Sequence, residues 1–135
     1  MKFADLIKDT NIITGEKLET EALIVAQKVL CNMGLDMIPR TYADFLRQYN
    51  GLKHNGVYLF GATVEDDLDI IDKNEQLDKP QNTILLGYND FDLLGYNFKQ
   101  KQYQIIDRAD FEVLETYSED EMDEALASIF SVQPK

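Results

Sequence analysis

Residues 83–116 read TILLGYNDFDLLGYNFKQKQYQIIDRADFEVLET, and this stretch carries most of the evidence for the fold. It holds four runs that are rich in β-branched and aromatic residues, separated by short polar or glycine-containing stretches. Connections this short join antiparallel neighbours, so the pattern predicts a strand meander. We expect strands at residues 83–88, about 93–98, 103–106 and 111–116, with residues 99–101 as a hairpin tip.

The flanking residues predict one more strand and a closing helix. Upstream, residues 57–60 form a short strand that Gly61 ends, and residues 65–77 are compatible with either an irregular helix or a loop. Downstream, Ser118 and Glu121 have the spacing of a capping box. The helix that follows has one apolar face, made of Met122, Ala125, Leu126, Ile129 and Phe130.

Apolar residues near the N-terminus recur at helical spacing, and Gly34 follows them as a helix stop. Cys31 lies within this pattern, where we expect a small buried thiol. It is the only cysteine, so an internal disulfide is excluded. The predicted helical stripe consists of Leu18, Ala22, Val25, Ala26, Val29 and Met33.

A second, shorter helix follows Pro39, which imposes an extended entry. Thr41 with Asp44 is a capping signal, and Asn50-Gly51 ends the helix. Helices, a strand meander and a closing helix describe an α+β domain. We therefore expect one domain over residues 1–135, a mainly antiparallel sheet of about five strands with N-terminal helices and a C-terminal helix packed on it. The apolar face of the second helix is Tyr42, Phe45, Leu46 and Tyr49.

The composition excludes several classes of function. The chain has 135 residues, with 25 acidic and 13 basic side chains, a net charge of −12 and a pI near 4.3. Nucleic-acid affinity depends on Lys and Arg contacts with phosphate, so this charge argues against direct nucleic-acid binding. It argues equally against an anionic membrane surface. Charges near the N-terminus interrupt any signal-peptide core, so we expect a cytoplasmic protein, one whose charge suits a basic partner.

The acidic residues are concentrated in two segments. Residues 65–78 contain seven acids against one lysine, and residues 107–124 contain nine acids against one arginine. The rest of the chain is close to neutral. Two such segments would make a negative face that steers a basic partner if they converge in space, and they would be ordinary solvated surface if they do not.

Few residues are arranged for catalysis or metal binding. His54 is the only histidine, and we expect it in an exposed turn. Asp90 and Asp92 match two positions of a calcium loop, but Leu94 and Lys101 stand where strong ligands belong, so we expect a tight turn. The chain contains no phosphate-binding glycine motif, and its carboxylates come in solvated clusters. We expect no catalytic residue, no metal site and no cofactor.

The segment 38–46, followed by Tyr49-Asn50-Gly51, resembles the signature of the SUKH superfamily. Members read "apolar-Pro, two residues, Tyr, two or three residues, Phe-Leu, a few residues, Asn-Gly". Residues 56–61 resemble the next family strand, and residues 84–87, 103–107 and 114–117 follow in family order. The resemblance covers roughly residues 36–131 and, within the superfamily, is greatest to the YrhA-like branch. The signature residues, which have structural roles, are Pro39, Tyr42, Phe45, Leu46, Asn50 and Gly51.

The resemblance implies a non-catalytic protein-binding domain. Many bacterial members are immunity proteins that neutralise toxins, often nucleases, by direct binding. We therefore expect an acidic face that occupies the basic surface of a cognate toxin. Acidic residues and an aromatic anchor would form the partner-binding set, namely Glu65, Asp66, Asp67, Asp69, Asp90 and Asp92 with Tyr88 or Phe91.

Other interpretations stay open from the sequence. Tyr88 and Phe91 are alternatively buried in the sheet. The domain is alternatively a regulatory or scaffold module of the cell-wall-regulator type, with a housekeeping partner. An enzyme acting on a cationic or sugar substrate would instead need a deep cleft that holds a carboxylate of raised pKa.

Overall fold

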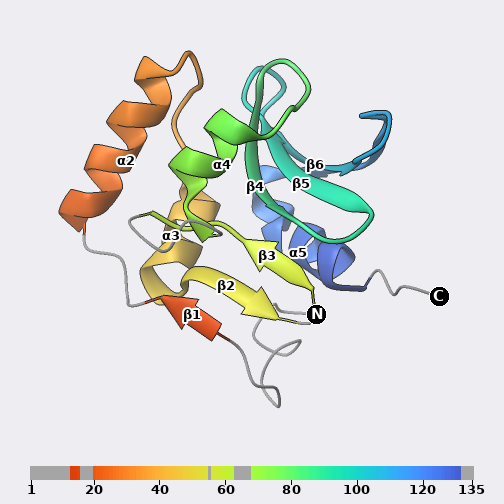
Figure 1. Ribbon diagram of the computed structural model, residues 1–135, viewed down its shortest axis with the longest axis horizontal. Helices are drawn as coiled ribbons and strands as arrows, with labels where there is room; N and C mark the ends of the chain where they lie inside the picture. Colours follow the sequence, from red (N-terminus) through yellow and green to blue (C-terminus); the bar gives the residue numbers. More distant parts are fainter. Residues whose placement is uncertain (1–12, 16–19, 55, 63–67, 132–135) are drawn as a thin grey trace.

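The computed structural model describes residues 13–15, 20–54, 56–62 and 68–131. Helices and strands alternate in blocks along the chain (Figure 1). In chain order the elements are β1 (Ile13–Gly15), α2 (Thr20–Asn32), α3 (Arg40–Gln48), β2 (Asn50–His54), β3 (Val57–Leu59), α4 (Ile70–Gln76), β4 (Thr83–Tyr88), β5 (Asp92–Asn97), β6 (Gln102–Asp107), β7 (Val113–Ser118), the 3-10 helix η2 (Glu119–Glu121) and α5 (Met122–Ser131).

The strands form one antiparallel sheet in which spatial order follows chain order, from β1 to β7. The α+β class and the meander are confirmed, and the described residues hold seven strands where about five were expected. The two additional strands are β1 and β2. His54 is therefore the last residue of strand β2, so the expectation of a turn at this residue is wrong.

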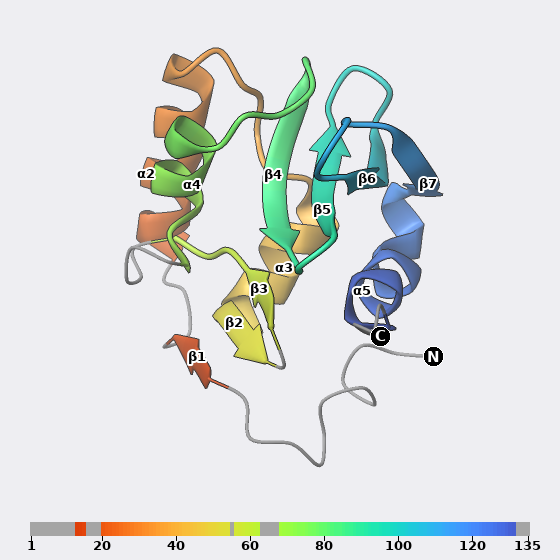
Figure 2. The same cartoon turned by 45° about the vertical axis from the view of Figure 1, so that its right-hand side comes forward.

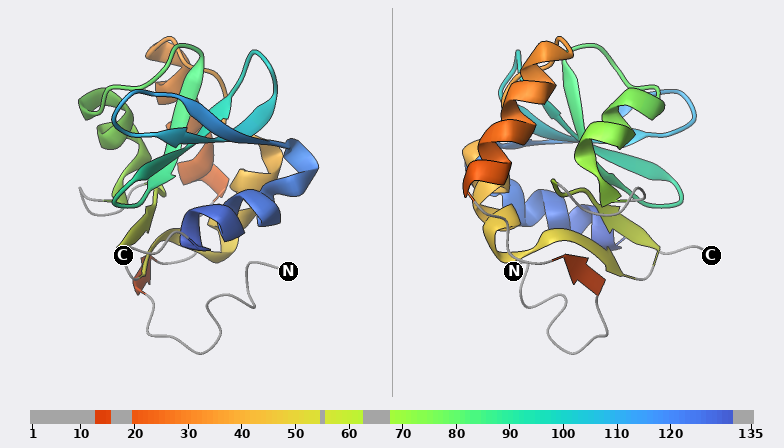
Figure 3. Two further views of the ribbon diagram at one scale, coloured as in Figure 1. Left: turned by 90° about the vertical axis from the view of Figure 1, so that its right-hand side faces the viewer. Right: turned by 60° about the vertical axis from the view of Figure 1, so that its left-hand side comes forward.

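The helices cover different parts of the sheet. Helix α4 packs against β4 and α2 against α4, whereas α3 packs on β2 and α5 on strands β5 to β7. Figure 2 shows α2 and α4 together on one side of the molecule, and Figure 3 shows α5 apart from them. The core lies between these helices and the sheet, and its largest fully buried side chains include Tyr42, Phe60 and Tyr103. No helix in the described residues is long and apolar enough to cross a membrane.

The first long helix differs from its prediction in the face that it buries. Leu23, Ala26 and Leu30 are buried, while Val25 is 58% exposed. Cys31 is exposed, so the expectation of a buried thiol is wrong. Apolar side chains occur on more than one face of this helix, so spacing alone does not determine which face is turned inward. The expected stripe residue Leu18 lies outside the described residues.

The shorter helix α3 begins as predicted but is not capped as predicted. Pro39 is extended, with φ −63° and ψ 149°, and no side-chain cap hydrogen bond is formed there. The Thr41 hydroxyl hydrogen-bonds the Tyr103 hydroxyl and donates to the Glu119 carbonyl at 3.1 Å instead. Thr41 therefore ties α3 to β6 and η2. The capping box at Ser118 is confirmed, with the Ser118 N–H donating to Glu121 Oε1 at 2.9 Å.

The signature residues lie in the core and join α3 to the sheet. The Tyr42 hydroxyl donates to the carbonyls of Phe60 and Leu86, the latter at 3.0 Å. The side-chain amide of Asn50 pairs with both backbone groups of Ala62, at 2.7 and 2.8 Å. A Cβ on Gly61 would lie 2.5 Å from Asn50 Oδ1, so only glycine fits beside this pair.

Candidate protein-binding edge

The two acidic segments do not converge in the described part of the chain. The described acids of the first segment lie in α4 and directly beside it, and those of the second extend from the end of β6 through β7 and η2 to α5. Figure 2 shows α4 and β7 on opposite sides of the molecule. Glu65, Asp66 and Asp67 lie outside the described residues. The charge excess therefore makes two separate acidic surfaces.

Exposed large apolar side chains identify one of these surfaces as the stronger candidate site. They fall into two groups among the described residues. One group, Ile24, Val25 and Met37, is on and beside α2. The other group lies at the β4–β5 turn, the β6–β7 turn and the start of β7, and consists of Phe91, Phe111, Val113 and Leu114. We call the surface formed by residues 89–91, 108–112 and 113–118 the acidic edge.

The side chain of Asn89 stabilises the β4–β5 turn through hydrogen bonds to its backbone. Its side-chain oxygen accepts hydrogen bonds from the N–H groups of Phe91 and Asp92, at 2.9 and 2.7 Å. Its side-chain amide donates to the Ile129 carbonyl of α5 at 2.9 Å. Asn89 itself is 4% exposed. The turn is thus fixed to the body of the protein, while the Phe91 ring at its tip is 49% exposed.

Arg108 connects this turn to the next one. Its Nη1 donates to the Asn89 carbonyl at 2.7 Å, and its N–H donates to the Phe91 carbonyl at 3.1 Å. Phe111 sits in the same turn with φ 62°, a conformation that bulky side chains rarely adopt, and its N–H donates to the Asp107 carbonyl. The exposed aromatics Phe91 and Phe111 are therefore carried by two mutually fixed turns.

A row of cations and aromatic rings crosses four neighbouring segments behind these turns. The rings of Tyr58 and Tyr88 stack at 5.0 Å with an interplanar angle of 4°. Lys53 Nζ lies 5.1 Å from the Tyr58 ring, and the Arg108 guanidinium lies 4.9 Å from the Tyr88 ring. Cations attract aromatic faces, so the row holds Arg108 in place. Tyr88 is half-buried within this row and is less available as an anchor than Phe91.

Asp92 is buried, with a relative exposure of 7%, and is therefore not part of the exposed surface of the acidic edge. Burial raises the pKa of its carboxyl group above its usual value, and the nearby carboxylates of Asp107 and Glu115 raise it further. The residue was expected to contact a partner, yet its carboxylate faces other acids within the fold. Asp90 beside it is exposed, as a partner-binding residue must be.

Asp69 of the first acidic segment has a structural role in the fold. Its carboxylate caps α4 by accepting a hydrogen bond from the Ile71 N–H at 2.9 Å. A further polar contact fixes the same helix, because the buried Asn74 side chain pairs with both backbone groups of Leu85 in β4. The expected partner-binding residues are thus not brought to one place: Asp90 and Phe91 share the acidic edge, and Asp69 lies elsewhere.

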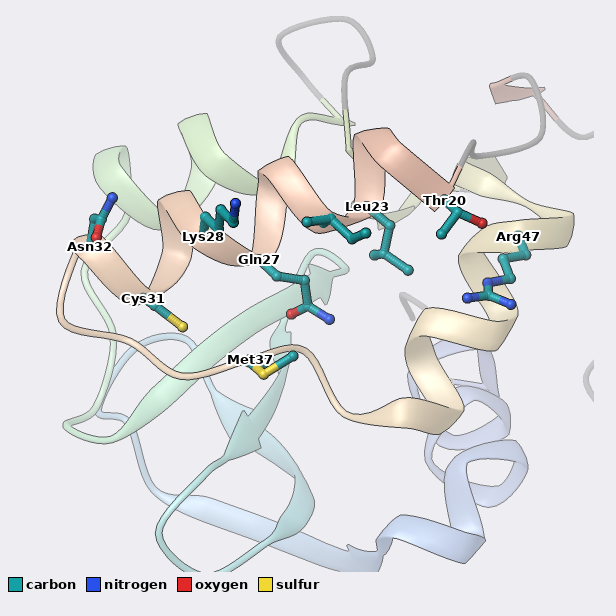
Figure 4. Close-up of a pocket in the computed structure, with 9 residues that line it drawn as sticks. Thr20, Leu23, Gln27, Lys28, Cys31, Asn32, Met37 and Arg47 are labelled. Carbon is teal, nitrogen blue, oxygen red and sulfur yellow. The ribbon is translucent and has the colours of Figure 1, made fainter.

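Ile24 and Met37, two of the exposed apolar residues on and beside α2, line a hollow of about 450 Å³. Gln27 and Cys31 point from α2 toward Met37, whereas Leu23 points toward the end of the hollow where Arg47 of α3 lies (Figure 4). None of the described residues that line this hollow carries a carboxylate, so this described lining lacks the acid or base that the enzyme interpretation requires. In the part of the chain that the structure describes, no three His, Cys, Asp or Glu side chains gather in a group that could hold a metal.

Sequence reasoning did not identify Arg108, Phe111, Val113 or Leu114 as candidate site residues. Arg108 is the only cation among residues 107–124, and this isolated positive charge is the one sequence feature that could have marked it as a candidate. Val113 and Leu114 are consecutive residues of a predicted strand, and this pattern does not show that the strand lies at the edge of the sheet. A scan against protein-family models found none that matches the chain, and a search of curated proteins found no match.

Proposed function

We propose that the protein is a non-catalytic, cytoplasmic protein-binding module that neutralises a cognate bacterial toxin by direct binding. One observation carries the proposal: four large apolar side chains are exposed on the acidic edge, which two fixed turns and a strand hold in shape. Exposed apolar groups framed by polar residues are typical of protein interfaces. The resemblance of residues 36–131 to SUKH immunity proteins supports the same conclusion.

The chemistry of the acidic edge favours a basic partner. Asp90, Asp110 and Glu112 are exposed around Phe91 and Phe111, so a positively charged surface would be attracted over a long range and then anchored by the rings. Neutralisation would follow from occupying the toxin surface that meets its own substrate. A basic nuclease is the partner class that this charge fits best.

Growth protection in cells that express the toxin encoded beside this chain tests the proposal. We expect the wild-type chain to protect, and the double charge reversal Asp90→Lys with Glu112→Lys to lose protection. Glu75→Lys with Asp78→Lys is the matched control, because it makes the same charge change at two exposed, described residues of the segment 65–78. No protection by the wild-type chain, or a stable non-toxin partner in its place, contradicts the proposal.

A further inference from the structure

We propose that the outer edge of β7 accepts an extended segment of the partner as an eighth strand, a segment in which Lys or Arg alternates with apolar residues. The inference rests on the proposed function, because it assumes that the ligand is a protein. It goes further in naming main-chain pairing as the mode of binding and an alternating basic strand as the partner element.

The hydrogen bonds on the inner side of β7 show which backbone groups are already used. The Asp107 N–H donates to the Glu112 carbonyl at 2.8 Å, so the backbone groups of Asp107 face β7. Backbone groups alternate in direction along a strand. Ile105 and Tyr103 therefore face β7 as well, because β6 pairs with β5 without interruption from Gln102 to Asp107.

The β7 residues opposite Ile105 and Tyr103 show that the backbone groups of Thr116 point outward from the sheet. Glu115 lies opposite Ile105, and Tyr117 lies opposite Tyr103. Thr116, between them, turns its N–H and carbonyl away from β6, toward the side of β7 where no strand pairs in the described residues. An outward donor and acceptor on one residue can pair with an added strand.

Strand β7 lacks most of the features that usually protect an edge. It is six residues long, its sequence VLETYS contains no Lys, Arg or Pro, and every residue but the half-buried Tyr117 is exposed. The opposite edge strand β1 has only three residues. A β-bulge does interrupt β7 opposite Ile106, and the Ser118 N–H is used by Glu121. The stretch open to pairing is therefore 114–117.

Charge selects the occupant of this edge. Residues 107–124 hold nine acids and one arginine, so two copies of β7 side by side would bring like charges together. A basic segment would be attracted by the same charges, and its apolar side chains would cover Val113 and Leu114, which are 43% and 48% exposed. A partner strand of alternating basic and apolar residues satisfies both requirements.

The test uses the whole chain and a labelled synthetic peptide in which Lys and Val alternate, followed by fluorescence anisotropy and amide chemical shifts. We expect binding that weakens with salt, with shifts concentrated at residues 114–117. Thr116→Pro removes an outward N–H without removing a hydrogen bond to β6, and it should weaken binding about tenfold. Thr116→Val retains that N–H and should bind like the wild type. The same peptide with every backbone N–H methylated should not bind to the wild-type chain. This second test does not depend on whether Thr116→Pro folds.

Three results of the peptide and sedimentation experiments would overturn the proposal. One is equal affinity of the methylated and unmethylated peptides, or of folded Thr116→Pro and Thr116→Val. Another is no binding of the Lys-Val peptide, or shifts located away from β7. The third is a wild-type dimer in sedimentation that Thr116→Pro abolishes, which would assign the edge to a second copy. Toxin protection that survives in Thr116→Pro rejects this inference alone, whereas absent protection by a wild-type chain that binds the peptide rejects only the proposed function.

Discussion

Arg108 donates from Nη1 to the carbonyl oxygen of Asn89 at 2.7 Å, across 19 positions of sequence. The bond joins the β4–β5 turn to the β6–β7 turn, and the same guanidinium lies over the Tyr88 ring. The lone cation of residues 107–124 thus holds together the two turns that present Phe91 and Phe111. Its role is to position the exposed rings of the acidic edge.

Replacing Arg108 should loosen that edge more than it destabilises the fold. Arg108→Ala removes one hydrogen bond and one cation–aromatic contact at an exposed residue, so we expect a loss of about 1 kcal/mol in urea unfolding. Amide exchange at Phe91 and Asp92 should accelerate, while Arg108→Lys, which keeps the charge near Tyr88, should show a smaller change. Unchanged exchange at both amides would show that Arg108 does not hold the turn.

Phe111 should be more useful for binding than for stability. Its φ of 62° is costly for a bulky residue, whereas asparagine tolerates this conformation. We expect Phe111→Asn to raise the free energy of unfolding by about 1 kcal/mol and to weaken partner binding. Phe111→Leu is the control, since it keeps an apolar side chain in the same strained conformation. A Phe111→Asn variant that is less stable than the wild type would show that the ring has packing contacts that outweigh the strain.

Asp92 should make stability depend on pH in an unusual direction for a carboxylate. Burial raises its pKa above 3.8 in the folded state, so ionisation of Asp92 disfavours the fold. That cost is absent below the unfolded-state pKa and is fully present above the raised folded-state pKa. Asp92→Asn should therefore melt at a higher temperature than the wild type at pH 7, and the difference should shrink as the pH falls toward 4. A difference that grows on acidification would contradict the raised pKa.

The sheet was predictable because its strands carry strong local signals. Strand β4 begins and ends at the predicted residues Thr83 and Tyr88, and β5 and β6 lie within one residue of their predictions. Strand β2 was missed because it is largely polar, with Leu52 the single large apolar residue in its sequence NGLKH. Short polar strands are recognisable only from the neighbours that they pair with.

The candidate site was harder to predict because it depends on strand order. Val113 and Leu114 have the pattern of a strand, but only the position of β7 at the end of the sheet exposes them. The Asn89–Arg108 bond likewise depends on the meander bringing two turns to the same end. Asp90 and Asp92 are both aspartates in the same short segment, so the sequence does not distinguish them. Asp92 is buried where β5 pairs with β6 opposite Asp107.

The two groups of exposed apolar residues provide a matched comparison for the binding surface. Phe91→Ala with Leu114→Ala truncates the acidic edge, and Ile24→Ala with Met37→Ala truncates similarly exposed side chains beside the α2 hollow. Both double variants should fold with near wild-type stability, because surface truncations of this kind change stability little. Growth protection against the toxin encoded beside the chain should be lost in the first and retained in the second. Protection retained in the first and lost in the second would place the binding surface on α2 and contradict this account.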